Sequence, residues 1–382
     1  MTFSDDFDKK LLTILTCNKV QFFAIYNGGY NMKIKVALLD TDKSYISKVT
    51  AALLDRYSEK LEVHSFTSAE SAISGVMNYG INVLIISTDF KEEFVDKDLR
   101  CVLAYFCNSI DVDTIDGKPA ISKFQRIDDL YRRILMIYSE NSESVVFRDS
   151  EESEIILFSS PCGGTGTSSM AVAFAIYAAS KGKKPIYINI ECFGDTDVFF
   201  NAPGFSDMTD IIYALKSKRK NLRIKLEAAI RSDENGVQFL KSPKTALDIM
   251  DVSTDEKLLL LSELRASSLS DLIVIDTDFS MGKDGEELLK YANKIVWVSD
   301  GSKSANSKIL KATEAQKILS QQTKEQILEK ANLVYNKFSS KISTQIHSEY
   351  LSELGGAPRY EHAATKDVLK ALSTLGIWEK LL

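Results

Sequence analysis

The sequence has few of the residues that build zinc sites or disulfide frameworks. Its 382 residues include five cysteines and three histidines, and no two cysteines are spaced as CxxC. A small, odd and scattered set of cysteines disfavours a zinc site and favours a reducing compartment. No apolar run reaches the ~20 residues that a membrane-spanning helix needs. The first residues are acidic where a signal peptide is basic, so we expect a cytoplasmic protein.

The sequence also has no excess of positive charge. Its 47 Lys and Arg residues face 53 Asp and Glu, which gives a net charge of −6 and argues against a protein that coats nucleic acid. The densest basic run, residues 216–225 (KSKRKNLRIK), has the charge to meet DNA, anionic lipid or an acidic partner. The alternative is a solvated helix face neutralised by nearby acids. The composition is that of a soluble globular protein with room for two domains.

The most informative segment is residues 159–169, SSPCGGTGTSS. It follows a short apolar run at residues 155–158, which is typical of a buried parallel strand. It precedes residues 170–180, MAVAFAIYAAS, which predict a buried helix. A strand, a glycine-rich turn and a helix in this order are the context of a phosphate-binding loop.

This loop lacks the lysine that normally accompanies its glycines. Gly163, Gly164 and Gly166 let consecutive backbone N–H groups converge on an anion at a helix N-terminus. The usual lysine position before the hydroxyl pair is Thr167. The loop is therefore predicted to hold phosphate and to be poorly equipped to cleave it.

Strands and helices alternate from residue 32 onward, which predicts a doubly wound parallel sheet with its ligand site at the carboxyl ends of the strands. The interval between the last two strands is too short and polar for a good helix. Residues 32–139 resemble the receiver domain of response regulators. The expected strands are 33–39, 61–64, 83–86, 101–106 and 119–122, and the expected helices are 44–56, 68–78 and 127–139.

The predicted receiver keeps some of the family's functional residues and lacks its phosphoacceptor. Asp40 and Asp42 follow the first strand, and Lys123 follows the last. The phosphoacceptor aspartate of the family is replaced by Ser87, with Asp89 two residues further on. A serine cannot form the acyl phosphate on which receiver switching relies, so we expect a pseudo-receiver that acts as a docking surface. The alternative is that the two early acids only cap the following helix.

The remaining chain divides into three further parts. Residues 1–31 are an N-terminal extension, either a loose appendage or a helix at residues 7–15. The polar, acid-rich residues 140–153 are predicted to be a linker. Residues 154–382 form the second domain.

This second domain resembles the MinD/ParA group of P-loop ATPases, and within it the TadZ/CpaE proteins of tight-adherence pilus assembly, which join an atypical receiver to such an ATPase. The group's loop is KGGxGK[ST][ST], and Cys162 and Thr167 occupy its two lysine positions. The fold class implied is α/β, with two doubly wound parallel-sheet domains. The ATP-binding residues implied are Cys162, Gly163, Gly164, Thr165, Gly166, Thr167, Ser168 and Ser169.

The resemblance also implies a magnesium site. Asp276 ends an apolar strand at residues 271–278 and takes the place of the Walker B acid. Asn189 and Glu191 replace the two acids of a DxD motif. The implied ligands of Mg²⁺ are Ser168, Asn189 and Asp276, partly through water, while Glu191 and Asp276 would serve catalysis. An asparagine carries no charge and is a weaker magnesium ligand than an aspartate.

The adenine contacts implied by the resemblance lie near the C-terminus. Asn336 ends the strand predicted at residues 331–338, and Pro358 lies in a predicted loop at residues 355–360. In the family these positions recognise the base. Asn336 has an alternative role as a turn-capping residue after the strand.

The missing lysines shape the functional expectation. A charge-assisted hydrogen bond contributes ~1.5–3 kcal/mol, so their loss weakens nucleotide binding, and hydrolysis suffers more because the charge acts chiefly in the transition state. Lys283 and Lys303 are candidates for a replacement cation. We expect an ATP- and Mg²⁺-binding homodimer, at most a weak ATPase, that localises pilus components at the cell pole or the inner membrane face. The alternatives are an active ATPase that cycles on membrane or DNA and a response-regulator-like signalling protein.

The C-terminal residues 368–382, VLKALSTLGIWEKLL, predict a helix with Trp378 near its end. In MinD such a helix inserts at the membrane surface. Here the basic face is thin and Gly376 interrupts the helix, which favours docking on the chain's own domain over a weak membrane contact.

Overall fold

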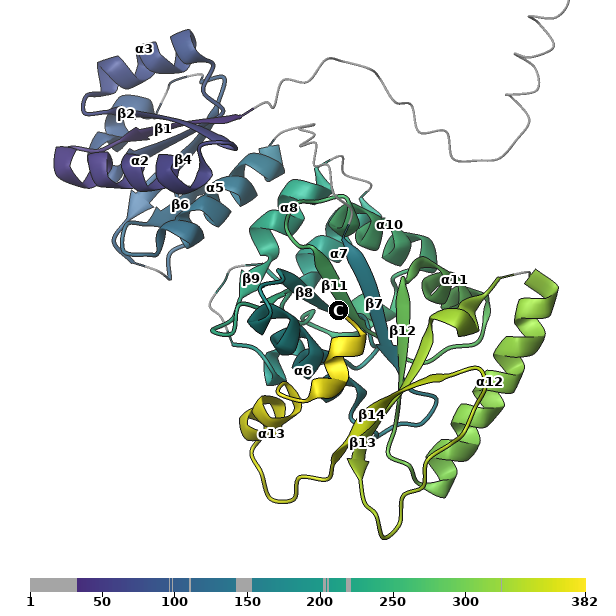
Figure 1. The fold of residues 1–382 in the computed structure, drawn as a ribbon. Helices are drawn as coiled ribbons and strands as arrows, with labels where there is room; N and C mark the ends of the chain where they lie inside the picture. Colours follow the sequence, from purple (N-terminus) through teal and green to yellow (C-terminus); the bar gives the residue numbers. More distant parts are fainter. Residues whose placement is uncertain are drawn as a thin grey trace, which may run out of the picture. The chain divides into compact units, whose positions relative to one another are not determined.

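The computed structural model describes residues 33–95, 97, 99–109, 111–141, 153–201, 204, 206–217, 221–323 and 325–382. The chain divides into two units, Met1–Asn31 and Met32–Leu382. The predicted N-terminal extension with its alternative helix at residues 7–15 lies outside the described residues, as does most of the predicted linker at residues 140–153. The described chain is an α/β protein with two mostly parallel sheets, as the sequence predicts (Figure 1).

The first sheet has the strand order β2-β1-β3-β4-β6-β5. All its pairings are parallel except that of β5 with β6, so the main strands follow the doubly wound order of flavodoxin-like folds. The strands are β1 (Ile34–Leu39), β2 (Leu61–Phe66), β3 (Val83–Ser87), β4 (Val102–Cys107), β5 (Thr114–Ile115) and β6 (Lys118–Ser122). The helices are α2 (Lys43–Tyr57), α3 (Ala69–Tyr79), η1 (Thr88–Phe90), α4 (Lys91–Phe94) and α5 (Ile127–Asn141).

The connection between β4 and β6 confirms the prediction that it is too short for a helix. Its described residues contain the two-residue strand β5, which pairs back on β6, and no helix. Between β3 and β4 the chain forms only η1 and the four-residue α4. The loops at this end of the sheet are therefore short and lie close to the ends of the strands.

The second sheet has eight strands in the order β14-β13-β12-β7-β11-β8-β10-β9 (Figure 1). All are parallel to their neighbours except β9, which is antiparallel to β10. The strands are β7 (Glu154–Ser159), β8 (Pro185–Asn189), β9 (Arg231–Ser232), β10 (Gln238–Phe239), β11 (Leu272–Asp276), β12 (Lys294–Ser299), β13 (Ala331–Phe338) and β14 (Ser352–Pro358).

Helices cover both faces of this sheet. Most of them follow a strand and precede its parallel neighbour, as crossover connections require. They are α6 (Thr167–Ser180), η2 (Thr196–Val198), α7 (Met208–Lys216), α8 (Leu222–Ala229), α9 (Ala246–Met250), α10 (Thr254–Arg265), α11 (Lys283–Tyr291), α12 (Lys303–Thr323), η3 (Ile327–Lys330), α13 (Thr365–Leu372) and η4 (Gly376–Lys380).

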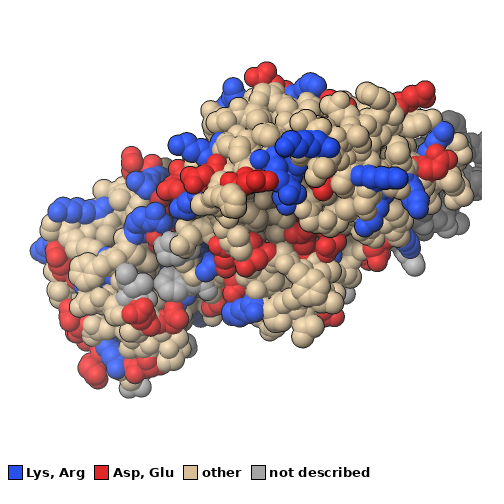
Figure 2. All heavy atoms as spheres, turned by 90° about the horizontal axis from the view of Figure 1, so that it is seen from below, with Lys and Arg blue, Asp and Glu red and all other residues tan. Residues whose placement is uncertain are grey.

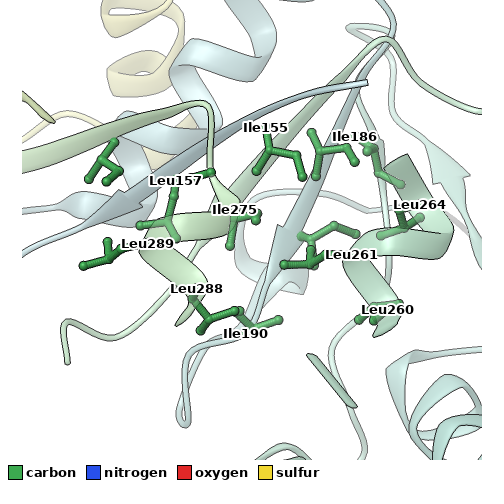
Figure 3. Close-up of a cluster of buried hydrophobic side chains, with 14 of the residues drawn as sticks. Ile155, Leu157, Ile186, Ile190, Leu260, Leu261, Leu264, Ile275, Leu288 and Leu289 are labelled. Carbon is green, nitrogen blue, oxygen red and sulfur yellow. The ribbon is translucent and has the colours of Figure 1, made fainter. Parts of the chain in front are cut away.

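Strand β7 explains why a continuous apolar run predicts a central strand. Ile155 and Leu157 join the hydrophobic cluster on one face of the sheet, and Ile156 and Phe158 join the cluster on the other. Side chains alternate along a strand, so a strand covered on both faces is apolar at every position. Figure 3 shows the first cluster, in which leucines of α10 and α11 lie near isoleucines of the central strands.

The C-terminal segment packs on its own domain, which confirms the favoured interpretation. Trp378 is fully buried, and its ring lies 6.3 Å from the ring of Phe158 and 5.6 Å from that of Phe174. Its Nε1 donates a hydrogen bond of 2.8 Å to the carbonyl oxygen of Leu372. The aromatic cluster therefore supports β7 and α6, the two elements that flank the glycine-rich loop.

Helix α8 of the second domain contacts the receiver-like domain. Ile224 and Ala228 pack in the same hydrophobic cluster as residues of α5. Glu227 Oε1 lies 2.6 Å from Lys60 Nζ and accepts a 2.7 Å hydrogen bond from the hydroxyl of Tyr131. One carboxylate thus joins two receiver side chains to the second domain.

The described residues of the basic run at 216–225 are neutralised by nearby acids. Lys216 Nζ lies 2.8 Å from Asp251, and Arg223 Nε lies 3.4 Å from Glu263. Figure 2 shows lysine and arginine side chains interspersed with acids on the face that it presents. For these residues the solvated helix face is the better interpretation.

Candidate functional site

The glycine-rich loop lies between β7 and α6, at the carboxyl edge of the second sheet. Gly164 and Gly166 have φ of +81° and +84°, a backbone conformation that favours glycine. A Cβ atom added at Gly163 or Gly164 would meet nothing within 4 Å. Gly166 caps α6 without a side-chain hydrogen bond, so its first N–H groups receive no such cap. The loop is an open cradle for an anion.

The cradle opens into a cavity of about 290 Å³. Most of the predicted loop residues line it, as does Glu191, whereas Thr165 is buried beneath. Ligand pockets usually span ~300–1,000 Å³, so this cavity suits the phosphate end of a ligand rather than a whole nucleotide. The loop residues that line it are Cys162, Gly163, Gly164, Gly166, Thr167 and Ser168.

Asp276 ends β11 beside the loop, and its carboxyl group is completely buried. Its Oδ2 accepts a 2.7 Å hydrogen bond from the hydroxyl of Tyr187 on the neighbouring strand β8. Its Oδ1 has no hydrogen-bond partner. A buried polar atom without a partner is costly, so this oxygen marks a place that a ligand would complete.

Asn189 bridges the acids around Asp276. Its Nδ2 donates to Tyr187 Oη at 3.1 Å, and to Glu191 Oε2 and Asp276 Oδ2 at 3.3 Å each. Its Oδ1 accepts the backbone N–H of Glu191 at 2.9 Å. Both ends of the amide are therefore engaged within the protein. Its role as a magnesium ligand stays a prediction, and this geometry does not favour it.

The acids of the site hold their protons more tightly than usual. Burial, reinforced by the charge of Glu191, raises the pKa of Asp276 to about 7. Burial and the charge of Asp278 raise the pKa of Glu191, although Ser168 Oγ donates a 3.2 Å hydrogen bond to Glu191. Burial also raises the pKa of Tyr187 well above 10. Negative charge in this site lacks compensation, which favours a cation.

The donor set fits Mg²⁺ that shares a ligand's phosphates. Within the described residues, no three His, Cys, Asp or Glu side chains come together as a self-contained metal site. Magnesium at nucleotide sites is typically held by one or two carboxylates plus phosphates and water. The unpaired Oδ1 of Asp276 and the hydroxyl of Ser168 near Glu191 match that requirement.

Asn336 contacts the phosphate loop itself. It is buried, and its Nδ2 donates a 2.9 Å hydrogen bond to the carbonyl oxygen of Thr165. Pro358 lines a second cavity of about 390 Å³ together with Tyr335 and Phe338. The structure thus brings Asn336 to the loop and Pro358 to a neighbouring hollow, and their adenine contacts remain predictions.

The predicted loop at residues 355–360 is wrong in part. Residues up to Pro358 belong to the edge strand β14, which pairs in parallel with β13. Gly355 has a φ of +127° and lies next to a register shift between Leu333 and Val334. Two glycines and a proline favour a loop, but pairing with β13 stabilises an irregular edge strand instead.

The sequence analysis missed two residues of this site. Tyr187 lies within an apolar strand, where its hydroxyl gives no signal in the sequence. Lys337 follows Asn336 and lines the phosphate cavity, with its Nζ 2.8 Å from the carbonyl oxygen of Gly164. The predicted candidates Lys283 and Lys303 begin α11 and α12 and do not line this cavity.

The receiver-like site is already paired within the protein. Asp40 is 1% exposed, and Lys123 Nζ lies 2.5 Å from its Oδ2. Ser87 is buried, and its hydroxyl donates a 3.0 Å hydrogen bond to Asp89. Asp42 caps α2 by accepting the backbone N–H of Tyr45 at 3.0 Å. The capping alternative therefore holds for Asp42, while Asp40 keeps the acid–lysine pair of a receiver.

Comparison with known proteins identifies the first domain. Residues 32–139 match the family described as TadZ-like, receiver domain. No curated protein matches the chain significantly. None of the described helices is long and apolar enough to span a membrane.

Solved structures similar to the chain come from the ParA and MinD ATPases. A ParA family ATPase from Chlorobium tepidum is 21% identical, with a TM-score of 0.46, over 60% of this chain and 96% of the other. The MinC:MinD cell division complex of Aquifex aeolicus is 17% identical, with a TM-score of 0.45, over 60% and 89%. MinD from Pyrococcus horikoshii, complexed with Mg-ADP, is 14% identical, with a TM-score of 0.44, over 60% and 96%.

Proposed function

We propose that this chain, whose residues 32–139 are a TadZ-like receiver domain, is a dimeric ATP- and Mg²⁺-binding scaffold for pilus assembly with weak or absent ATP hydrolysis. One observation carries the nucleotide site. The open cradle of Gly163 and Gly164 faces the same cavity edge as the helix N-terminus of α6 and the acids that follow β8 and β11. Backbone N–H groups and the helix dipole bind phosphate without any lysine.

Weak hydrolysis follows from the residues at the two lysine positions. Cys162 and Thr167 line the phosphate cavity and carry no positive charge at the transferring phosphoryl group. That charge acts chiefly in the transition state, so its absence lowers the rate of hydrolysis more than it lowers the affinity. Bound nucleotide then persists and holds two copies of the chain together.

Ser168 and Asp276 would hold Mg²⁺ with the nucleotide phosphates, where the ion would neutralise phosphate charge. Glu191 lines the cavity and accepts the hydroxyl of Ser168 at 3.2 Å. Its raised pKa disfavours the ionised form that orients an attacking water. Its catalytic contribution is therefore small in this proposal.

The receiver domain serves as a docking module in this proposal. Ser87 stands where an acyl phosphate would form, and it is buried and bound to Asp89. A domain without phosphoryl switching keeps its surface as its means of action. The proposed partners are pilus assembly or polar proteins, which the scaffold recruits at the cell pole or the inner membrane face.

The test measures binding, mass and turnover on one preparation. Purified protein is titrated with ATP and Mg²⁺ by calorimetry, its mass is followed by light scattering, and phosphate release is assayed. We expect saturable binding, a shift from monomer to dimer, and negligible phosphate release. Rapid release of phosphate would favour the second candidate, an active ATPase that cycles on membrane or DNA.

A matched pair of variants assigns binding to the loop. Gly163 faces open space, so Gly163→Glu adds a negative charge to the cradle without a steric clash. Gly163→Gln adds nearly the same volume without the charge. Binding of ATP should be lost in the first variant and only weakened in the second. Equal binding by both variants and the wild type would contradict the proposed site.

A further inference from the structure

A lysine from the far end of the domain reaches the phosphate loop, and it lies 173 residues from its loop partner in the sequence. We propose that Lys337 supplies the phosphate-binding cation that the loop itself lacks. This inference rests on the proposed nucleotide site and names the residue that replaces the two missing lysines. The proposal depends on the position of Lys337, its backbone conformation and its lack of a carboxylate partner.

The end of β13 holds the loop by two consecutive residues. Lys337 Nζ donates a 2.8 Å hydrogen bond to the carbonyl oxygen of Gly164, and Asn336 Nδ2 donates one of 2.9 Å to that of Thr165. A Cβ added at Gly166 would lie 3.5 Å from Lys337 Cε. The ammonium group therefore sits at the wall of the phosphate cavity.

The backbone of Lys337 is unusual, and it explains how both residues reach the loop. Consecutive side chains of a regular strand point to opposite faces. Lys337 has a φ of +56°, which non-glycine residues rarely adopt, and the pairing of β13 with β14 shifts register between Tyr335 and Phe338. This break turns the side chains of Asn336 and Lys337 to the same loop. Backbone strain of this kind is typical of functional sites.

Lys337 has no carboxylate to neutralise it. Among the described residues, the partner of its Nζ is the carbonyl oxygen of Gly164. A lysine has three N–H donors, so two remain for an anion. Lys123 in the receiver domain shows the contrast, because its ammonium is committed to the buried Asp40. A half-buried, unpaired ammonium at the wall of a phosphate cradle is suited to bind phosphate oxygens.

The test separates a phosphate contact from a mere clamp on the loop. Binding of ATP, ADP and adenosine is measured by calorimetry for the wild type and for Lys337→Met, Lys337→Asn and Lys337→Arg. Asparagine adopts positive φ more readily than other residues, so Lys337→Asn keeps the backbone and removes the charge. Lys303→Met is the control, because Lys303 does not line the cavity.

A charge-assisted hydrogen bond of ~1.5–3 kcal/mol corresponds to a roughly 10- to 100-fold change in affinity. Lys337→Met and Lys337→Asn should weaken binding of ATP and ADP by that factor and leave adenosine unchanged. Lys337→Arg should stay close to the wild type, and so should Lys303→Met.

Two outcomes overturn the inference while the proposed function stands. One is wild-type affinity for ATP in both neutral variants. The other is an equal loss for ATP and adenosine together with a lower melting temperature, which is the signature of a structural clamp. If the wild type binds neither ATP nor ADP, the proposed function fails and the inference fails with it.

Discussion

In the receiver domain the polar groups at the carboxyl edge of the sheet satisfy one another, whereas in the P-loop domain several of them lack partners. Asp40 is paired with Lys123, and Ser87 donates to Asp89. In the second domain Oδ1 of Asp276 has no partner, and Lys337 has only a backbone carbonyl. Both sites lie at the same place in related architectures, where α/β sheets bind ligands.

This difference separates two ways of losing chemistry. The receiver site replaces its phosphoacceptor by Ser87 and closes on itself, so no group remains for a ligand to complete. The P-loop site replaces its lysines by Cys162 and Thr167 but keeps an open cradle and an uncompensated buried acid. Unsatisfied buried groups cost stability, and a ligand that satisfies them recovers it. We infer that the first site is structural and the second is occupied in its working state.

The largest expected effect comes from opening the receiver site. Lys123→Met leaves Asp40 buried without its cation, and breaking such a pair typically costs ~3–5 kcal/mol. Urea unfolding should show a loss of that size. The double variant Asp40→Asn, Lys123→Met should recover most of it, because it removes both charges. A loss below ~1 kcal/mol, typical of an exposed pair, would show that the site is not closed.

The next effect comes from the glycines of the P-loop. A non-glycine residue in the left-handed region costs roughly 1–2 kcal/mol, and a Cβ at Gly166 would lie only 2.4 Å from Asn336 Nδ2. Gly166→Ala should therefore lower the free energy of unfolding by more than Gly164→Ala, whose Cβ meets open space. It should also weaken ATP binding. Equal losses in the two variants would contradict the close contact with Asn336.

A pH-dependent effect follows from the buried Asp276. Its pKa is raised to about 7 in the folded protein, and an unfolded aspartate has a pKa of roughly 3.9. Between these values the folded state binds more protons, so stability falls as pH rises, by about 1.4 kcal/mol per pH unit at most. Above about pH 7 the fall ends.

Asp276→Asn removes this proton, and the variant should gain stability relative to the wild type as the pH rises from 5 to 8. Urea unfolding without nucleotide or magnesium measures the difference. Asp255→Asn, at an exposed position of α10, is the control. Parallel stability curves for the wild type and Asp276→Asn would show that this acid is not held in an uncompensated environment.

The smallest expected effect is the absence of one. Acetyl phosphate should leave the mass of the protein unchanged, because Ser87 cannot form an acyl phosphate and its hydroxyl is bound to Asp89. Intact-mass spectrometry checks this result. A phosphorylated species that maps to the receiver domain would contradict the proposal that this domain is only a docking module.

The elements with a strong local signal could be predicted from the sequence. The run before the P-loop is apolar because β7 is covered on both faces, and the glycines that follow it have the positive φ that they suggest. Asp276 was found because an acid follows a buried strand. For these positions, local pattern and tertiary structure agree.

The residues that complete the site could not be predicted in this way. Tyr187 reads as a core residue, and only the parallel register of β8 with β11 brings its hydroxyl to Asp276. Lys337 reaches the loop through a single left-handed residue in a strand, which the sequence does not signal. Lys283 and Lys303 had the right charge in loops after later strands, but these loops lie outside the phosphate cavity. Contacts of long sequence separation decide such sites.

The most direct test of the account is the fate of ATP in the dimer. Protein is incubated with ATP and Mg²⁺, the dimer is isolated by size exclusion, and the bound nucleotide is identified by chromatography after overnight storage. The account predicts that the dimer contains intact ATP, with little ADP and little free phosphate. A dimer that has converted its ATP to ADP, or a monomer without nucleotide, would contradict the central claim that this site binds nucleotide without consuming it.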